Sequence, residues 1–295
     1  MIDRLECLLA LAQERHFGRA AIACGTTQPS FSAAIKHLEQ SFGTQLVERG
    51  SRFHGFTPAG ERVLDWARRI VADGRAMRQD VASLRHALTG QLRIAAIPTA
   101  MPMLARLTVP FAERHPGLSI SILSRNAAGV QAMLDNLEID AGVTYLDAER
   151  QRRVVAVRLF DERLRFVCAA TDPLASRASL AWAELSGLRL CLLTPDMQNR
   201  RTIDRALHEA GATPQVTLES DSMLALLAHL RTGRWASILP EHWLDTLGLG
   251  AGLRTMPLES PALVATVGII APQREPMTAL TTALLAQAAL FDRVS

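Results

Sequence analysis

One predicted helix carries small polar side chains opposite an apolar face. In residues 25–39, GTTQPSFSAAIKHLE, four apolar residues recur at i, i+3, i+4 and i+7: Phe31, Ala34, Ile35 and Leu38. Thr27 can cap the first turn, in which Pro29 is tolerated. The opposite face carries donors, acceptors and a cation: Gln28, Ser30, Ser32, Lys36 and His37. Such side chains on a helix can contact base edges and phosphates in the major groove of DNA.

The residues before this helix favour a helix-turn-helix. In HFGRAAIACG, Ala21 precedes Gly25 by four residues, and Phe31 follows that glycine by six. The small residue lets two helices cross closely, the glycine permits a turn at positive φ, and the aromatic ring fills the inner corner. We expect an earlier helix to supply the third wall through Leu5, Leu8, Leu9 and Ala12. The alternative is an ordinary solvated face in a helical bundle, which this spacing disfavours.

A basic hairpin is expected directly after the motif. The segment LVERGSRFHGFTPAG contains glycines together with Arg49, Arg52 and His54. Cations at the tip of a hairpin can neutralise DNA phosphates. The sequence therefore predicts a wing, which completes a winged helix-turn-helix.

A long helix follows the hairpin. Thr57 can cap it, Pro58 suits its first position, and Gly90 can end it. Apolar residues then alternate spacings of four and three, which is a heptad seam with Gly74 inside it. The pattern predicts that two copies pair along residues 59–90 through Val63, Ala67, Ile70, Met77, Val81, Leu84 and Leu88. The alternative is a helix that lies along its own domain.

Residues 1–88 resemble the DNA-binding and linker-helix part of the LysR-type transcriptional regulators. The resemblance rests on FGRAA, TQPSFSAAIKHLEQSFGTQLVER and FTPAGERVL. It implies a winged helix-turn-helix over residues 1–58 and a dimerising linker helix over 59–90. The DNA contacts that it implies are Gln28, Pro29, Ser30, Ser32, Lys36, Arg49 and Arg52. Ala33 stands where the family often has a longer polar residue, so the family's sequence preference is not carried over.

The rest of the chain alternates short apolar runs with helical stretches, which predicts an α/β fold with mostly parallel sheets. The expected strands are QLRIAAI, LSISILS, DAGVTY, LRFVCAA, LRLCLLT, ASILP and LVATVGIIA, and the expected helices are 100–114, 127–137, 197–210, 221–232 and 276–291. The resemblance implies a two-lobed effector domain of the periplasmic-binding-protein type. Lobe I would contain residues 91–161 and 268–295, and lobe II residues 162–267.

Polar residues gather where predicted strands end and helices begin. Helix N-termini offer unpaired N–H groups, and ligands of open α/β sheets bind at the carboxyl ends of strands. The candidates for binding an effector are Thr99, Ala100, Ser124, Arg125, Asn126, Tyr145, Thr194, Pro195, Asn199 and Arg200. We expect a small anion there, most simply a carboxylate. The alternative is that the threonines and asparagines only cap helices and that Arg200 faces solvent.

Two short motifs suggest which anion this is. TPDMQNRR and RTGRWASILP resemble the branch of LysR-type regulators that is encoded beside formate dehydrogenase operons. This resemblance implies formate or another very small carboxylate as the effector.

Composition excludes several other classes. The net charge is +3, and no apolar run reaches the roughly 18 residues of a membrane span. The start, MIDRLECLLALAQERHFG, lacks the basic region of a secretory signal, so we expect a cytoplasmic protein. No G-x-S-x-G, H-E-x-x-H or P-loop motif is present, so we expect neither an enzyme nor a bound cofactor.

A redox sensor is the remaining alternative. Four cysteines lack the spacing of a metal site. Cys168 and Cys191 lie in two predicted strands that could be neighbours, and a regulator of the same family could sense oxidants through them. Their apolar flanks would raise the pKa of both thiols, which disfavours reactivity.

Overall fold

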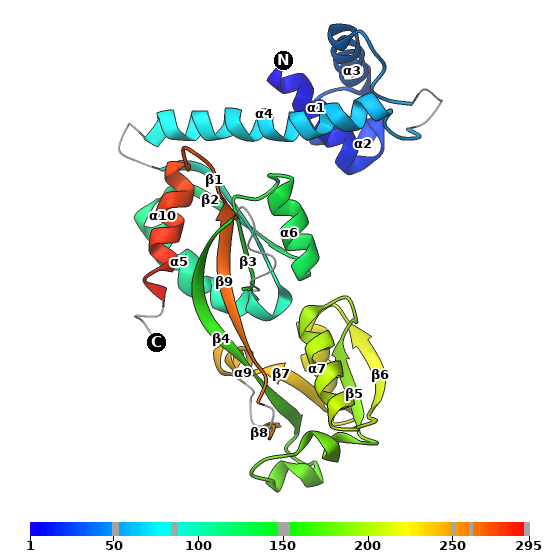
Figure 1. Cartoon of the computed structure of the whole chain (residues 1–295), viewed down its shortest axis with the longest axis vertical. Helices are drawn as coiled ribbons and strands as arrows, with labels where there is room; N and C mark the ends of the chain where they lie inside the picture. The colour runs from blue at the N-terminus through cyan, green and yellow to red at the C-terminus, as the bar shows by residue number, and fades with distance from the viewer. Residues whose placement is uncertain (49–52, 84–87, 147–153, 249–251, 260–261, 292–295) are drawn as a thin grey trace. The chain divides into compact units, whose positions relative to one another are not determined.

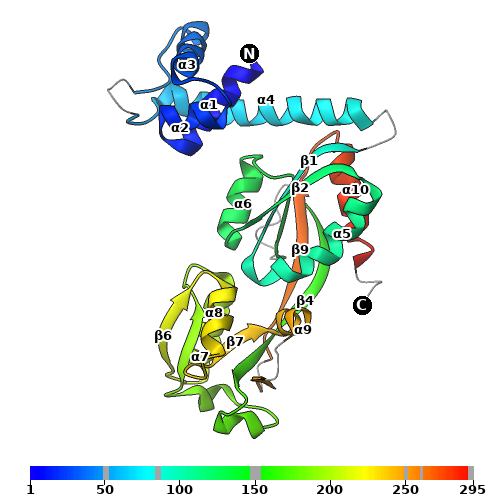
Figure 2. The same ribbon diagram turned by 180° about the vertical axis from the view of Figure 1, so that it is seen from behind.

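The computed structural model describes residues 1–48, 53–83, 88–146, 154–248, 252–259 and 262–291. Three of the predicted site residues, Arg49, Arg52 and Leu84, lie outside these ranges. The chain divides into two compact units (Figures 1 and 2), Met1–Leu88 with Asp135–Glu138, and Thr89–Leu134 with Ile139–Ser295. Within the described ranges, no helix has both the length and the apolar character that crossing a membrane requires.

The described residues of the first unit form helices α1 (Ile2–Glu14), α2 (Phe17–Ala23), α3 (Gln28–Phe42) and α4 (Pro58–Ser83). Its core forms where α1, α2, α3 and the first half of α4 meet. The ring of Phe31 is fully buried and packs edge-on against Phe17, at 6.1 Å between ring centroids. From α1 the buried residues are Leu5, Leu8 and Leu11. The expectation is confirmed for Leu5 and Leu8, and Leu9 and Ala12 are half-buried and pack against the same core.

The turn of the motif has the predicted chemistry. Gly25 adopts a φ of +63°, and Thr27 Oγ1 accepts a hydrogen bond from the Ser30 amide. After α3, an antiparallel bridge joins Val47 to Phe56 and begins the predicted wing. Glu39 Oε1 accepts hydrogen bonds from the amides of Leu46 at 2.9 Å and Val47 at 3.2 Å. This carboxylate thereby ties α3 to the base of the wing.

The residues of the predicted heptad seam lie on two faces of α4, one buried in the first unit and one exposed. Leu64, Ala67 and Val71 are buried in the unit's own core. The prediction that Ala67 pairs two chains is therefore wrong, because this residue has no exposed surface. Val63 also packs in part against that core. Four large apolar side chains remain exposed and form what we call the α4 stripe: Trp66 at 63%, Ile70 at 40%, Met77 at 61% and Val81 at 60%.

The second unit is built on one large and one small sheet. The strands are β1 (Thr89–Ala96), β2 (Gly117–Ser124), β3 (Ala141–Tyr145), β4 (Val154–Ala169), β5 (Arg189–Leu193), β6 (Gln215–Ser220), β7 (Ser237–Pro240), β8 (Leu253–Pro257) and β9 (Val264–Pro272). The large sheet has the order β2-β1-β3-β9-β4-β7, with β8 also paired to β4. The small sheet contains β5 and β6.

Helices flank both sheets (Figure 2). They are α5 (Leu104–Arg114), α6 (Ala127–Asp135), α7 (Gln198–Glu209), α8 (Met223–Leu230), α9 (Glu241–Leu247) and α10 (Ala279–Ala288), with short 3-10 helices at η1 (Pro98–Met103), η2 (Pro173–Ser176) and η3 (Trp182–Leu185). Helices α5, α6 and α10 accompany the strands of lobe I, and α7 and α8 accompany β5 and β6 of lobe II.

Strands β4 and β9 run through both lobes. The first part of β4 pairs with β9, from Val154 opposite Pro272 to Arg163 opposite Val264. The second part pairs with β7 and β8. The expected lobe boundaries after residues 161 and 267 thus fall inside continuous strands.

The expectation of mostly parallel sheets was wrong. Strand β1 runs parallel to β2 and β3, and β5 runs parallel to β6. The other four described pairings are antiparallel, and each involves β4 or β9. Strand β4 passes from lobe I to lobe II, and β9 passes back beside it. The two strands therefore run antiparallel. Strands β6 and β8 were not predicted, because their sequences are not continuous apolar runs. Helix α9 and the first half of β4 were also missed, although VVAVRLF in β4 is mostly apolar.

Candidate DNA-binding face and ligand cavity

The outer face of α3 is exposed in the part of the chain that the structure describes. Phe31, Ile35 and Leu38 are buried at 3% exposure or less. The five described residues that were predicted to contact DNA are all exposed or half-exposed at the surface: Gln28, Pro29, Ser30, Ser32 and Lys36. Buried apolar residues therefore fix the helix, and its polar side chains stay available for a partner.

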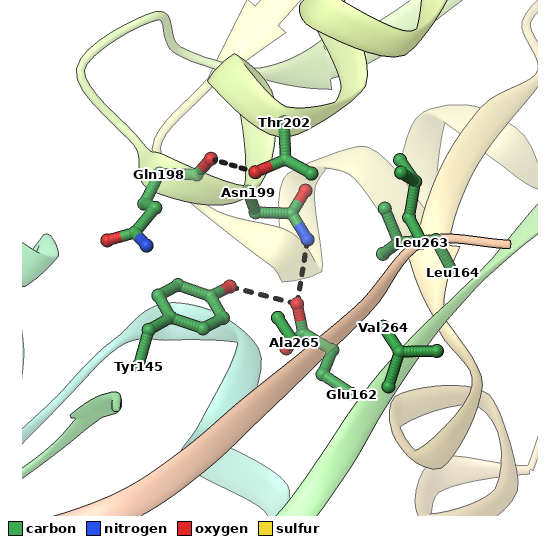
Figure 3. A pocket seen from close by; sticks show the side chains of 9 residues that line it. All are labelled: Tyr145, Glu162, Leu164, Gln198, Asn199, Thr202, Leu263, Val264 and Ala265. Atoms are coloured by element: carbon green, nitrogen blue, oxygen red, sulfur yellow. Dashed lines mark hydrogen bonds between the residues drawn. The ribbon is translucent and has the colours of Figure 1, made fainter. Parts of the chain in front are cut away.

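A cavity of about 60 Å³ lies where β3, β4, α7 and β9 approach one another (Figure 3). Its lining combines polar and apolar side chains: Tyr145, Glu162, Leu164, Gln198, Asn199, Thr202, Leu263, Val264 and Ala265. These residues come from segments far apart in the sequence and from both lobes. Of the ten predicted effector residues, Tyr145 and Asn199 line this cavity.

A chain of hydrogen bonds runs through the wall of the cavity. The Tyr145 hydroxyl donates to Glu162 Oε1 at 2.9 Å, and Asn199 Nδ2 donates to the same oxygen at 2.9 Å. Figure 3 shows these three side chains converging. The Thr99 hydroxyl lies 3.2 Å from the Tyr145 hydroxyl. Burial, followed by the charge of Glu162, raises the pKa of Tyr145 well above its usual range, so the phenol keeps its proton.

Glu162 is the central residue of the cavity, and it was not predicted from the sequence. Its side chain is buried, at 2% exposure, and its Oε2 has no hydrogen-bond partner. No described cation forms an ion pair with this carboxylate. A period-two reading of FDERL would have found it, because Phe160, Glu162 and Leu164 share one face of β4, whereas Asp161 and Arg163 point to the other. Gln198, Thr202, Leu164 and residues 263–265 were also missed.

Thr99 and Ala100 are buried beside the cavity and not in its lining. The Thr99 hydroxyl forms a hydrogen bond with the Tyr145 hydroxyl. The backbone carbonyl of Thr99 accepts a hydrogen bond from His242 Nε2 at 2.9 Å. His242 belongs to α9 of lobe II, so this bond joins the lobes. The predicted role of Thr99 as a direct ligand donor does not fit this geometry, whereas a role in positioning Tyr145 does.

The residues near Asn126 form a second contact between lobes. Asn126 Nδ2 donates to Asp196 Oδ2 at 2.7 Å, and Asn126 Oδ1 caps α6 by accepting from the Gly129 amide. The pKa of Asp196 is lowered first by the nearby Thr194 hydroxyl and then by the Asn126 amide. Ser124, Arg125, Thr194 and Pro195 do not line the cavity.

Arg200 was expected to hold an anion, and the structure contradicts this role. Its Nε donates to Asp204 at 2.8 Å, and its Nη1 donates to Glu219 at 2.7 Å and to the Leu193 carbonyl at 2.7 Å. The guanidinium is thus neutralised within lobe II, away from the cavity lining. The cavity contains a carboxylate where the prediction required a cation.

The two cysteines of the redox alternative do not lie in neighbouring strands. Cys168 is in β4, which pairs with β7, β8 and β9, and Cys191 is in β5, which pairs with β6. Their side chains belong to different core clusters. Burial raises the pKa of each thiol to about 11. Within the described part of the chain, no group of three or more His, Cys, Asp or Glu side chains could hold a metal ion.

Two family models match the chain. Residues 2–61 match the bacterial regulatory helix-turn-helix protein of the lysR family, and residues 85–290 match the LysR substrate binding domain. The first match lies in the first unit, and the second covers most of the second unit.

Individual proteins agree with these models. The chain is 28% identical over 270 residues to a hydrogen peroxide-inducible genes activator of Dickeya chrysanthemi, covering 91% of this chain and 88% of that protein. It is 29% identical to the DNA-binding transcriptional dual regulator OxyR of Escherichia coli over the same shares. The structure of a full-length OxyR variant from Pseudomonas aeruginosa has a TM-score of 0.74 at 26% identity, covering 98% of both chains.

The fold agrees with both family models. An N-terminal helix-turn-helix with an exposed polar recognition face precedes a two-lobed domain with a polar cavity. The chain belongs to the LysR family of bacterial transcriptional regulators.

Proposed function

We propose that the chain binds promoter DNA through α3 and changes its promoter binding when a small metabolite occupies the cavity beside Glu162. The observation that carries this proposal is the buried polar cluster of Tyr145, Glu162 and Asn199, which comes from both lobes. Burying a carboxylate without a cation is costly unless a ligand compensates. A ligand that contacts both lobes favours the lobe arrangement in which it can do so.

The chemistry of the cavity revises the expected effector. A small anion, formate included, would meet the carboxylate of Glu162 and would find Arg200 already paired. Like charges at short range repel strongly in a poorly solvated cavity. The geometry therefore favours a neutral or cationic ligand over the anion that the sequence suggested.

Lys36 provides the test of DNA binding. It is the only lysine of the chain, and it is exposed on the outer face of α3. Lys36→Ala should weaken retardation of the chain's own promoter DNA. The slope of log K against log salt should fall by about 0.9, the value of one phosphate contact. Arg205→Ala, which removes an exposed cation from α7, is the matched control and should leave both quantities unchanged. An absence of salt-dependent retardation by the wild type would refute the proposal.

Peroxide sensing is the second candidate, since relatives are named hydrogen peroxide-inducible activators. None of the nine residues that line the cavity is a cysteine. The pKa values of Cys7, Cys168 and Cys191 are each raised to about 11, first of all by burial. At pH 7 only about one such thiol in ten thousand is the reactive thiolate.

We therefore expect peroxide to leave promoter binding by the full-length chain unchanged. Titration of thiols in denaturant, before and after brief exposure to peroxide, should count the same number of free groups. The variant with Cys168→Ala and Cys191→Ala should retard DNA as the wild type does. If peroxide removes two free thiols and changes promoter binding over the same time, the chain senses oxidants and the metabolite proposal is wrong.

A further inference from the structure

Both hydroxyl groups in the cavity lining, those of Tyr145 and Thr202, donate to protein acceptors, and one oxygen of Glu162 has no donor. The Tyr145 hydroxyl donates its hydrogen to Glu162, and Asn199 donates to the same oxygen. The Thr202 hydroxyl donates its one hydrogen to the Gln198 carbonyl at 3.1 Å, so only its oxygen lone pairs remain to meet a ligand. Glu162 Oε2 accepts nothing from the protein. A ligand that pairs with Glu162 Oε2 must therefore bring a donor.

The negative charge of Glu162 also favours a ligand that brings hydrogen-bond donors. Glu162 is buried at 2% exposure, and the groups that meet its formal negative charge are a phenol and an amide, both neutral. Buried charges in proteins are usually paired. A protonated amine supplies three N–H donors and a full positive charge on one atom.

Size and shape limit the rest of the ligand. A water-sized volume is roughly 10–15 Å³, so the cavity of about 60 Å³ accepts about four to six non-hydrogen atoms. Leu164, Leu263 and Val264 line it with aliphatic surface. These side chains suit a short hydrocarbon body and offer no hydrogen bond.

We propose that the effector carries a small primary ammonium group that pairs with Glu162 Oε2, with a short aliphatic body against Leu164, Leu263 and Val264. This inference rests on the proposed function and specifies its ligand class. A charge-assisted bond between an ammonium and a carboxylate is roughly twice as strong as a neutral hydrogen bond. The ion pair would hold one end of the ligand at β4. If the ligand also contacts α7, it links the two lobes.

The test uses three probes of nearly equal size: propylammonium, 1-propanol and propionate. Binding to the full-length chain at pH 7 is followed by thermal shift and by calorimetry. Propylammonium should raise the melting temperature, and the alcohol and the carboxylate should have much smaller effects. Glu162→Gln keeps the shape and removes the charge, and should weaken propylammonium binding by at least about tenfold.

Glu209→Gln is the matched control. It removes an exposed carboxylate from α7, outside the cavity lining, and should bind propylammonium as the wild type does. Equal binding by Glu162→Gln and wild type would overturn the inference. So would preference for propionate or 1-propanol, or no response of the wild type to propylammonium.

Promoter retardation, measured on the same samples, separates this inference from the proposed function. If the ammonium fails but another class of ligand binds and changes retardation, the chain remains a metabolite-responsive regulator and only the ligand class is wrong. If no cavity ligand changes retardation while Lys36→Ala still weakens it, DNA binding stands without the sensing role.

Discussion

The full-length chain with Ile70→Asp and Met77→Asp is expected to be monomeric under conditions in which the wild type is a dimer. The α4 stripe of Trp66, Ile70, Met77 and Val81 has the spacings 4, 7 and 4, which place all four on one side of the helix. Between 40% and 63% of each side chain is exposed. A row of large, exposed apolar side chains is typical of an interface.

The expected effect is large because carboxylates would be buried in the interface without partners. Each should cost several kcal/mol of association free energy, so the dissociation constant should rise by at least about a hundredfold. Retardation of DNA with two half-sites should fall in parallel, since two half-sites require two linked heads. Light scattering and retardation measure the two effects.

Ala72→Asp with Ala76→Asp is the matched control for the stripe. It places two acids on α4 at positions that the helical period of 3.6 directs away from the four exposed residues. This variant should stay dimeric, and circular dichroism should report the same helix content for both variants. A monomeric wild type, or a dimeric Ile70→Asp, Met77→Asp variant, would exclude pairing through the stripe.

The first unit was largely predictable because its signals are local. The cap at Thr27, the turn at Gly25 and the apolar face of Phe31, Ile35 and Leu38 each depend on residues within one or two turns. The seam on α4 was harder, because a narrow apolar row can face its own domain or a partner. Ala67 is buried in its own unit whereas Ile70 stays exposed, and periodicity does not distinguish them.

The ligand cavity was only partly predictable, because its geometry depends on tertiary structure. Placing polar residues at strand ends identified Tyr145 and Asn199. It missed Glu162, which lies in the middle of β4, because the predicted strand began only at Leu164 and left the alternating residues of FDERL outside it. It misjudged Arg200, whose partners Asp204 and Glu219 come from α7 and β6, and β6 had not been predicted.

Gly60→Ala is expected to destabilise the first unit, although alanine normally favours a helix over glycine by about 1 kcal/mol. A Cβ atom at Gly60 would lie 2.0 Å from the Leu46 carbonyl oxygen and 2.9 Å from its carbon. That carbonyl cannot move freely, because it accepts from the Thr57 amide at 3.0 Å while the Leu46 amide donates to Glu39. The overpacking should lower the free energy of unfolding by about 2–3 kcal/mol.

Gly74→Ala is the matched substitution in the same helix, and the opposite result is expected for it. The added Cβ would meet only Ile2 Cδ1, at 3.1 Å, which is the flexible tip of a side chain near the chain start. Its effect should lie between no change and a gain of about 1 kcal/mol from helix propensity. Urea unfolding of the full-length chain compares the two variants, with hydrogen exchange of the amides in α1–α4 reporting on the first unit. If Gly60→Ala proves as stable as Gly74→Ala, the close approach of α4 to Leu46 does not limit this fold.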